Sequence, residues 1–187
     1  MNNKNIWNFI FELGQLRKIE HEGWRLINAD NIDSVAEHSL RAAQIGFILA
    51  KLENYQNPLE VVAIAVFHDV AECRTGDFHK VANRYINADE ERAVKEQIEN
   101  LGDIGKEIYH LWKQAEHKNT KAGIIAKDAD LLEQAAMAKE YLDKSYEFAQ
   151  DWINNVSKLL QTNAAKQLLA ALQETNSNDW WQGLKKI

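Results

Sequence analysis

His68 and Asp69 are two ligand-type side chains that directly follow an apolar segment, residues 61–67. Removing an ionised carboxylate and an imidazole from water costs on the order of several kcal/mol unless a partner compensates. Such a pair at the end of an apolar segment therefore indicates a cation nearby. Two further acidic residues, Glu72 and Asp77, follow shortly afterwards. The pattern predicts a metal site, with Glu72 close enough to move protons.

Two residues from other parts of the chain, His38 and Asp130, can complete the ligand set. Helical bundles build metal sites from side chains that project inward from different helices. Two imidazoles with two carboxylates suit Mn, Fe, Co, Ni or Zn better than an all-sulfur zinc site or an all-oxygen calcium site. We expect one divalent ion, of this group or Mg, that keeps positions open for water and a substrate oxygen and neutralises charge on a phosphoryl group.

The elements that must position these residues all have helical periodicity. Ser34 and Glu37 form a capping box, which places His38 in the first turns of a helix. Asn57 and Pro58 begin the next helix, which we expect to carry the His68-Asp69 pair and Glu72 on one side. The expected helices cover about 6–13, 35–52, 58–75, 87–101, 103–117, 120–150 and 156–174, with a short one near Trp180.

This pattern predicts an all-α fold, a helical bundle formed by one domain over residues 1–187. Its core is expected over about 5–150, with C-terminal helices over about 156–187 packed on it. The Trp180-Trp181 pair is expected to dock on this body rather than on a neighbouring subunit.

The composition restricts the partners of the chain. The net charge of −6 disfavours binding to a nucleic acid polymer, so a small anionic substrate fits better. No apolar run approaches the roughly 20 residues of a membrane span, and the N-terminal stretch lacks the apolar core of a signal peptide. The single Cys73 has no cysteine partner for an internal disulfide. We therefore expect a cytoplasmic protein without a membrane partner.

Four segments resemble, in order and spacing, the successive motifs of the HD-domain metal-dependent phosphohydrolases. They are Ser34-Val35-Ala36-Glu37-His38-Ser39, His68-Asp69-Val70-Ala71-Glu72, Thr75-Gly76-Asp77 and Lys127-Asp128-Ala129-Asp130. Within this superfamily the chain is most similar to the YfbR-like 5'-deoxynucleotidases, over about residues 5–150. The resemblance implies a bundle of the HD-domain type that hydrolyses deoxyribonucleoside 5'-monophosphates to deoxyribonucleoside and phosphate, and it suggests a homodimer.

The resemblance also implies roles for individual residues. The predicted ligands of one divalent metal are His38, His68, Asp69 and Asp130. Glu72 is implied to assist proton transfer as a metal-associated water attacks phosphorus. Asp77 is implied to lie close to the sugar and to that water.

The family places an aromatic and a basic residue ahead of the first metal histidine. Trp24 matches the aromatic position by its spacing to His38. Relatives carry an arginine directly before this tryptophan or two residues before that, where this chain has Gly23 and His21. Histidine is a weaker and pH-dependent phosphate partner than a guanidinium. Phosphate contacts are therefore expected from a wider set of residues: His21, Lys18, Arg25, Lys80 and Arg84.

Other functions remain open at this point. His110 and His117 lie seven residues apart and share a helix face, which permits a two-metal site in an HD phosphohydrolase acting on a diester, a triphosphate or an alarmone. A nucleotide-binding protein with a structural metal is the alternative without catalysis. Glu72 and Asp77 are also compatible with a solvated helix end and a turn, and Cys73 is expected to be inert.

Overall fold

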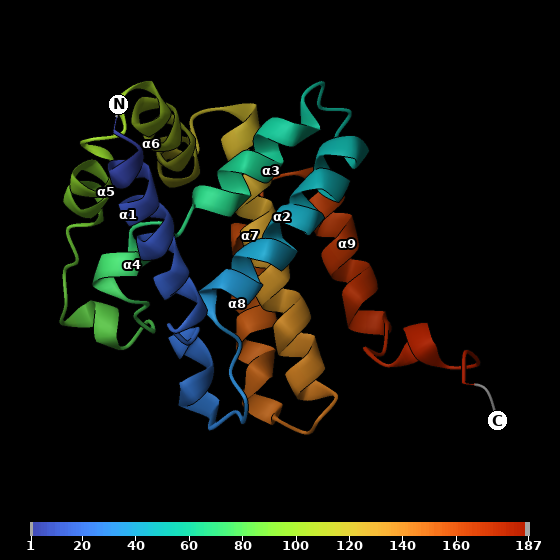
Figure 1. Ribbon diagram of the computed structural model, residues 1–187. Coiled ribbons are helices and arrows are strands. Elements are labelled where there is room, and N and C mark those ends of the chain that lie inside the picture. The colour runs from blue at the N-terminus through green and yellow to red at the C-terminus, as the bar shows by residue number, and fades with distance from the viewer. Residues whose placement is uncertain (1, 186–187) are drawn as a thin grey trace.

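The computed structural model describes residues 2–185, whose regular secondary structure is helical apart from one isolated β-bridge between Glu20 and Ser34. The all-α prediction is therefore confirmed for these residues. The α-helices (Figure 1) are α1 Asn3–Leu13, α2 Val35–Leu52, α3 Pro58–Phe67, α4 Glu72–Thr75, α5 Glu90–Ile98, α6 Gly102–His117, α7 Lys121–Leu142, α8 Gln150–Leu159 and α9 Asn163–Glu174. None of the helices in this range is long and apolar enough to cross a membrane.

Helix α7 occupies the middle of the molecule and packs against α2, α3, α6, α8 and α9 (Figure 1). Its alanines Ala129, Ala135 and Ala138 are fully buried, and their small side chains let neighbouring helices approach closely. Two acidic residues on the same helix, Asp130 and Glu133, are buried with them. Because a buried carboxylate requires partners, α7 must meet cationic or hydrogen-bonding groups at this depth.

A second, smaller apolar cluster connects α1, α5 and α6 with the turn that follows α3. Phe67, the last residue of α3, packs against both this cluster and the main core around α7. Val70 belongs to the second cluster. His68 and Asp69 therefore lie at the junction between the two apolar clusters.

The helix expected over 58–75 is interrupted, which corrects the sequence prediction. Helix α3 ends at Phe67, and the short α4 begins only at Glu72. Between them the backbone tightens, since the N–H groups of Val70, Glu72 and Cys73 donate to carbonyls three residues back instead of four. The turn changes the directions of His68 and Asp69 relative to a continuous helix.

The C-terminal helix boundaries also differ from those expected. Helix α7 ends at Leu142 rather than near residue 150, and the chain then reverses through Ser145, whose φ is +74°. The helix expected over 156–174 is instead the pair α8 and α9. The buried carboxylate of Asp128 accepts hydrogen bonds from the backbone N–H groups of Gln161 and Thr162 and thereby orders the turn between them. Earlier in the chain, α5 ends at Ile98, a few residues before the predicted end.

The segment after α9 extends away from the bundle (Figure 1). Trp180 in this segment is 77% exposed. The expectation that Trp180 docks on the body is therefore wrong. Trp181 is partly buried, and its indole N–H donates to Asn178 within the same short turn.

Candidate metal centre

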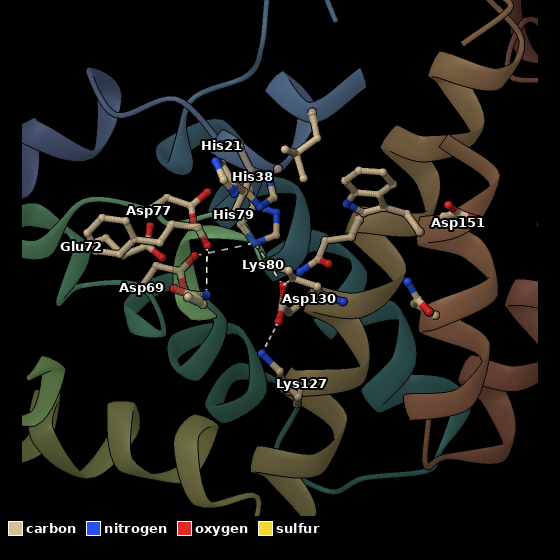
Figure 2. Close-up of a pocket in the computed structure, with 17 residues that line it drawn as sticks. His21, His38, Asp69, Glu72, Asp77, His79, Lys80, Lys127, Asp130 and Asp151 are labelled. Atoms are coloured by element: carbon tan, nitrogen blue, oxygen red, sulfur yellow. Dashed lines mark hydrogen bonds and ion pairs between the residues drawn. The ribbon is translucent and has the colours of Figure 1, made fainter. Parts of the chain in front are cut away.

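Four ligand atoms from three parts of the fold converge at the junction of the two clusters (Figure 2). His38 comes from α2, His68 and Asp69 from the turn after α3, and Asp130 from α7. The Nε2 atoms of the two histidines lie 3.3 Å apart. Asp130 Oδ1 is 3.2 Å from His38 Nε2, and Asp69 Oδ2 is 3.0 Å from His68 Nε2. Two imidazole nitrogens with two carboxylate oxygens at such distances form a donor set that fits a divalent transition metal.

The far side of each imidazole is held by a hydrogen-bond acceptor. His38 Nδ1 contacts the carboxylate of Glu133, and His68 Nδ1 lies 2.7 Å from the carbonyl oxygen of Ala65. Each ring can therefore donate from Nδ1 and direct the Nε2 lone pair toward the centre, as metal-binding histidines require. Glu133 is 1% exposed and is itself held by Arg41, whose Nε donates to Oε1 at 2.8 Å.

The electrostatics of the centre favour a bound cation. Burial opposes the charge of Asp130, but Lys127 and the two histidines outweigh it and hold the pKa of this carboxyl well below its usual range. Burial also opposes a charged His38, yet its hydrogen bonds with Asp130 and Glu133 raise the pKa of the imidazole well above its ordinary value. Protons and a metal ion therefore compete for the same negatively charged site.

Glu72 and Asp77 line the same cavity as Asp69. Burial, with the neighbouring charges of Asp69 and Asp77, raises the pKa of Glu72 to about 10. Its Oε2 is buried and finds no hydrogen-bond partner within residues 2–185. Asp77 Oδ2 accepts the backbone N–H of Glu22 at 2.7 Å. The pKa of Asp77 is raised by burial, although His21 and the Glu22 N–H act in the opposite direction. Glu72 and Asp77 are therefore not the solvated carboxylates that are expected at a helix end or in a surface turn.

The cavity has a volume of about 450 Å³, which lies in the range of small-molecule sites. The acidic residues described above form one end. Lys80 and Lys127 bring basic side chains to its wall, and His79 adds an imidazole whose Nδ1 accepts the backbone N–H of Ala82. Helix α8 contributes Trp152 and Asn155. The cavity therefore combines a candidate metal centre, cationic groups and an aromatic surface.

Comparison with known proteins identifies the family. A family model described as HD domain matches residues 13–173. The chain belongs to the HD-domain family. The 5'-deoxynucleotidase HDDC2 of Bos taurus is 28% identical and aligns with 94% of this chain and 88% of that protein. The 5'-deoxynucleotidase HDDC2 of Mus musculus is 30% identical over 74% of this chain and 70% of that protein. These matches confirm the resemblance carried by the four motifs.

A solved structure, a conserved hypothetical protein from Pyrococcus furiosus, supports the fold. It superimposes with a TM-score of 0.76 at 24% identity and covers 90% of this chain and 99% of that chain. At this identity the likeness concerns the arrangement of the helices alone.

In this HD-domain protein the predicted substrate contacts divide into two groups. His21 and Lys80 line the cavity. Lys18, Arg25 and Arg84 are exposed and lie outside its lining. Arg25 instead pairs with Glu22 at 3.0 Å and contacts His79.

Trp24 lies behind the cavity wall. It is only 1% exposed, whereas Trp152 stands at the wall with the two ring centroids 5.0 Å apart. Trp24 therefore supports the wall from the core. The aromatic surface that faces the cavity belongs to Trp152, which the sequence did not predict. No local signal marks Trp152, because it precedes the expected start of its helix.

Two basic residues of the lining were also missed or misplaced. Lys127 stands three residues before Asp130 on α7 and pairs with its Oδ2 at 2.6 Å, a contact that helical spacing alone suggests. His79, which no motif in the sequence singles out, is partly buried and lines the cavity.

The remaining candidates for chemistry lie elsewhere. His110 and His117 are exposed, and neither belongs to any candidate metal-ligand group in the described part of the chain. Cys73 is partly buried, and burial together with Glu12 raises the pKa of its thiol to about 11. A thiol with this pKa is a poor nucleophile at neutral pH, as expected.

Proposed function

We propose that this HD-domain protein is a divalent-metal-dependent 5'-deoxynucleotidase that releases phosphate from deoxyribonucleoside 5'-monophosphates. The observation that carries the proposal is the convergence of two histidines and two aspartates beside the buried Glu72, in a cavity of nucleotide size. Further support comes from relatives named 5'-deoxynucleotidase that align with most of the chain.

In this proposal His38, His68, Asp69 and Asp130 hold one divalent ion. When bound, such an ion lowers the pKa of a water molecule and neutralises charge on the phosphoryl group. The protein supplies the orientation of the ligands, because Glu133 and the carbonyl of Ala65 fix the two imidazole rings.

Proton transfer is assigned to Glu72. Burial and the neighbouring carboxylates stabilise its protonated form, so the Glu72 carboxyl can hold a proton at neutral pH and exchange it at the reacting oxygens. Asp77 is fixed by the backbone N–H of Glu22. From this position we assign it to orient the sugar and the attacking water.

Phosphate recognition is assigned to the basic groups of the lining. His21 and Lys80 were expected from the sequence, and Lys127 joins them because it lies against Asp130. Asp130 raises the pKa of Lys127 despite burial, so this ammonium stays charged at neutral pH. Lys80, Lys127 and the imidazole of His21 together can replace the forked contact of an arginine, although with less fixed geometry.

Phosphate release tests the function directly. The purified protein is assayed with dAMP, dGMP, dCMP, dTMP and dUMP in the presence of Mn, Co or Mg. We expect metal-dependent release from at least one of them and loss of that release in Asp69→Ala. Tight nucleotide binding without release from any of the five contradicts the enzymatic proposal, and elemental analysis that finds two metals per chain contradicts the single-metal site.

We further propose that the protein acts as a cytoplasmic homodimer on free nucleotides and not on nucleic acid polymers. The negative net charge supports the choice of a small substrate. Exposed apolar side chains on α2 and α3, among them Leu40, Ile48 and Leu59, support self-association. Light scattering that gives a monomer mass contradicts the dimer.

We also propose that the chain forms one domain, because α8 and α9 pack on α7.

A further inference from the structure

Helix α8 forms the wall of the cavity with Trp152, and it places Asp151 and Asn155 next to this indole. We propose that this wall is a subsite for the nucleobase, where the base stacks on Trp152 and its polar edge meets Asp151 and Asn155. The inference rests on the proposed function, since it assumes a nucleotide whose phosphate lies at the metal centre.

The indole of Trp152 is held in place by a buried aromatic group. Trp24 stacks on it with ring centroids 5.0 Å apart and an interplanar angle of 27°. Tyr141 packs on Trp24 in turn at 5.1 Å, and both supporting rings are almost fully buried. An aromatic surface fixed in this way loses little side-chain freedom when a planar ligand stacks on it.

Gly23 keeps the space beside the indole open. It also lines the cavity, and a Cβ atom at this position would already lie 3.5 Å from Nε1 of Trp152. A longer side chain would therefore occupy cavity volume next to the ring. The absence of a side chain at residue 23 leaves room for a flat ligand there.

The polar groups around Trp152 match the edge of a base. Asp151 and Asn155 are exposed, and both line the cavity together with Gln134 of α7. The Asp151 carboxylate accepts hydrogen bonds only, so it suits the exocyclic amino groups of adenine, guanine and cytosine. The amide of Asn155 both donates and accepts, whereas Gln134 already donates from Nε2 to Asp130 Oδ1 at 3.0 Å and offers mainly its carbonyl oxygen.

The two ends of the cavity differ in the way that a nucleotide requires. Figure 2 shows Asp151 on one side of the cavity, with Glu72 and Asp77 on the opposite side and Asp130 between them. Glu72 and Asp77 therefore lie across the cavity from the α8 wall, with Lys80, Lys127 and Asp130 in the middle (Figure 2). An aromatic surface with hydrogen-bonding neighbours is what remains for the uncharged, planar part of the substrate.

The decisive experiment compares a substrate that has a base with one that lacks it. Wild type, Trp152→Ala and Trp152→Phe are assayed with dAMP and with 2-deoxyribose 5-phosphate. Because stacking on an aromatic side chain contributes about 5- to 150-fold to binding, we expect Trp152→Ala to raise KM for dAMP by about tenfold or more. The kcat/KM for 2-deoxyribose 5-phosphate should change less than about twofold, and Trp152→Phe should recover part of the loss.

An equal loss for both substrates overturns the proposal, because it means that Trp152 only supports the fold. Trp180→Ala is the matched control, since it removes a tryptophan that is 77% exposed outside the cavity. If Trp152→Ala does not fold, Trp152→Phe and Asp151→Asn decide the question. Asp151→Asn must lower kcat/KM for dAMP relative to dTMP by at least about threefold, since thymine has no exocyclic amino group, and an unchanged ratio contradicts the subsite.

Failure of the nucleotidase itself is recognised separately. In that case the wild type releases phosphate from neither substrate, and calorimetry then compares binding of the two. The base subsite is supported without catalysis if the wild type binds dAMP more tightly than 2-deoxyribose 5-phosphate and this difference disappears in Trp152→Ala. Equal binding of both compounds refutes it.

Discussion

Glu133 gives the sharpest test of how the fold tunes the metal centre. Its buried carboxylate joins His38, a predicted metal ligand on α2, to Arg41 on the same helix. In Glu133→Gln the amide oxygen can still accept from His38 Nδ1, so the ring keeps its orientation. The substitution removes the negative charge that makes the imidazole a stronger ligand.

The expected size of the effect follows from this geometry. Loss of an outer-shell partner of a metal-binding histidine weakens metal affinity about 10- to 100-fold, or about 1.4 to 2.7 kcal/mol. Arg41 loses one of its two carboxylate partners and keeps Glu140 at 2.7 Å. We therefore expect Glu133→Gln to fold, whereas Glu133→Ala leaves the buried Nδ1 of His38 without an acceptor and destabilises the protein by about 1–3 kcal/mol.

Isothermal titration calorimetry measures the dissociation constant for Mn directly, with protein that a chelator has freed of metal. Glu140→Gln is the matched control, because it removes the other carboxylate partner of the same Arg41 without touching His38. We expect its metal affinity to change less than about threefold. Equal affinities for wild type and Glu133→Gln, with a normal melting profile for both, refute the assignment of Glu133 to the support of a metal ligand.

Three further predictions concern the same centre. Glu72→Gln should lower kcat by about 10²- to 10⁴-fold while metal binding and KM stay close to wild type, and an unchanged kcat contradicts its role in proton transfer. In the metal-free protein, burial and the charges of Asp69 and Asp77 raise the pKa of Glu72 from 4.5 to about 10. Between these two pH values the folded state binds more protons than the unfolded chain, so the stability falls as the pH rises. Urea unfolding of chelated samples from pH 5 to 9 should therefore show a steeper decline for wild type than for Glu72→Gln, and parallel curves count against the raised pKa. Saturation with Mn at about 100 times its dissociation constant should stabilise the fold by about 2.7 kcal/mol over the chelated protein, measured by thermal melting, and this gain should vanish in Asp130→Ala.

The features that the sequence predicted correctly depend on neighbours in the chain. The capping box is present, since Ser34 and Glu37 bond each other across three residues and start α2 before His38. The His68-Asp69 pair can also be recognised from its neighbours in the sequence. Two ligand-type residues directly after an apolar segment are unusual, whichever part of the fold that segment packs against. The same motifs predicted the family correctly, which the HD-domain match confirms.

Other features were decided only by contacts between distant segments. Three features depend on residues far apart in sequence: the packing of the turn after α3, where Gln97 donates to the carbonyl of Val70, the support of His38 by Glu133, and the place of Trp152 at the cavity wall. Trp24 illustrates the difference, because its spacing to His38 matches a substrate-binding position, yet Trp152 and Tyr141 enclose it in the core. Spacing along a helix determines which side chains share a face, whereas the packing of other helices against that face determines whether it meets the core or the cavity.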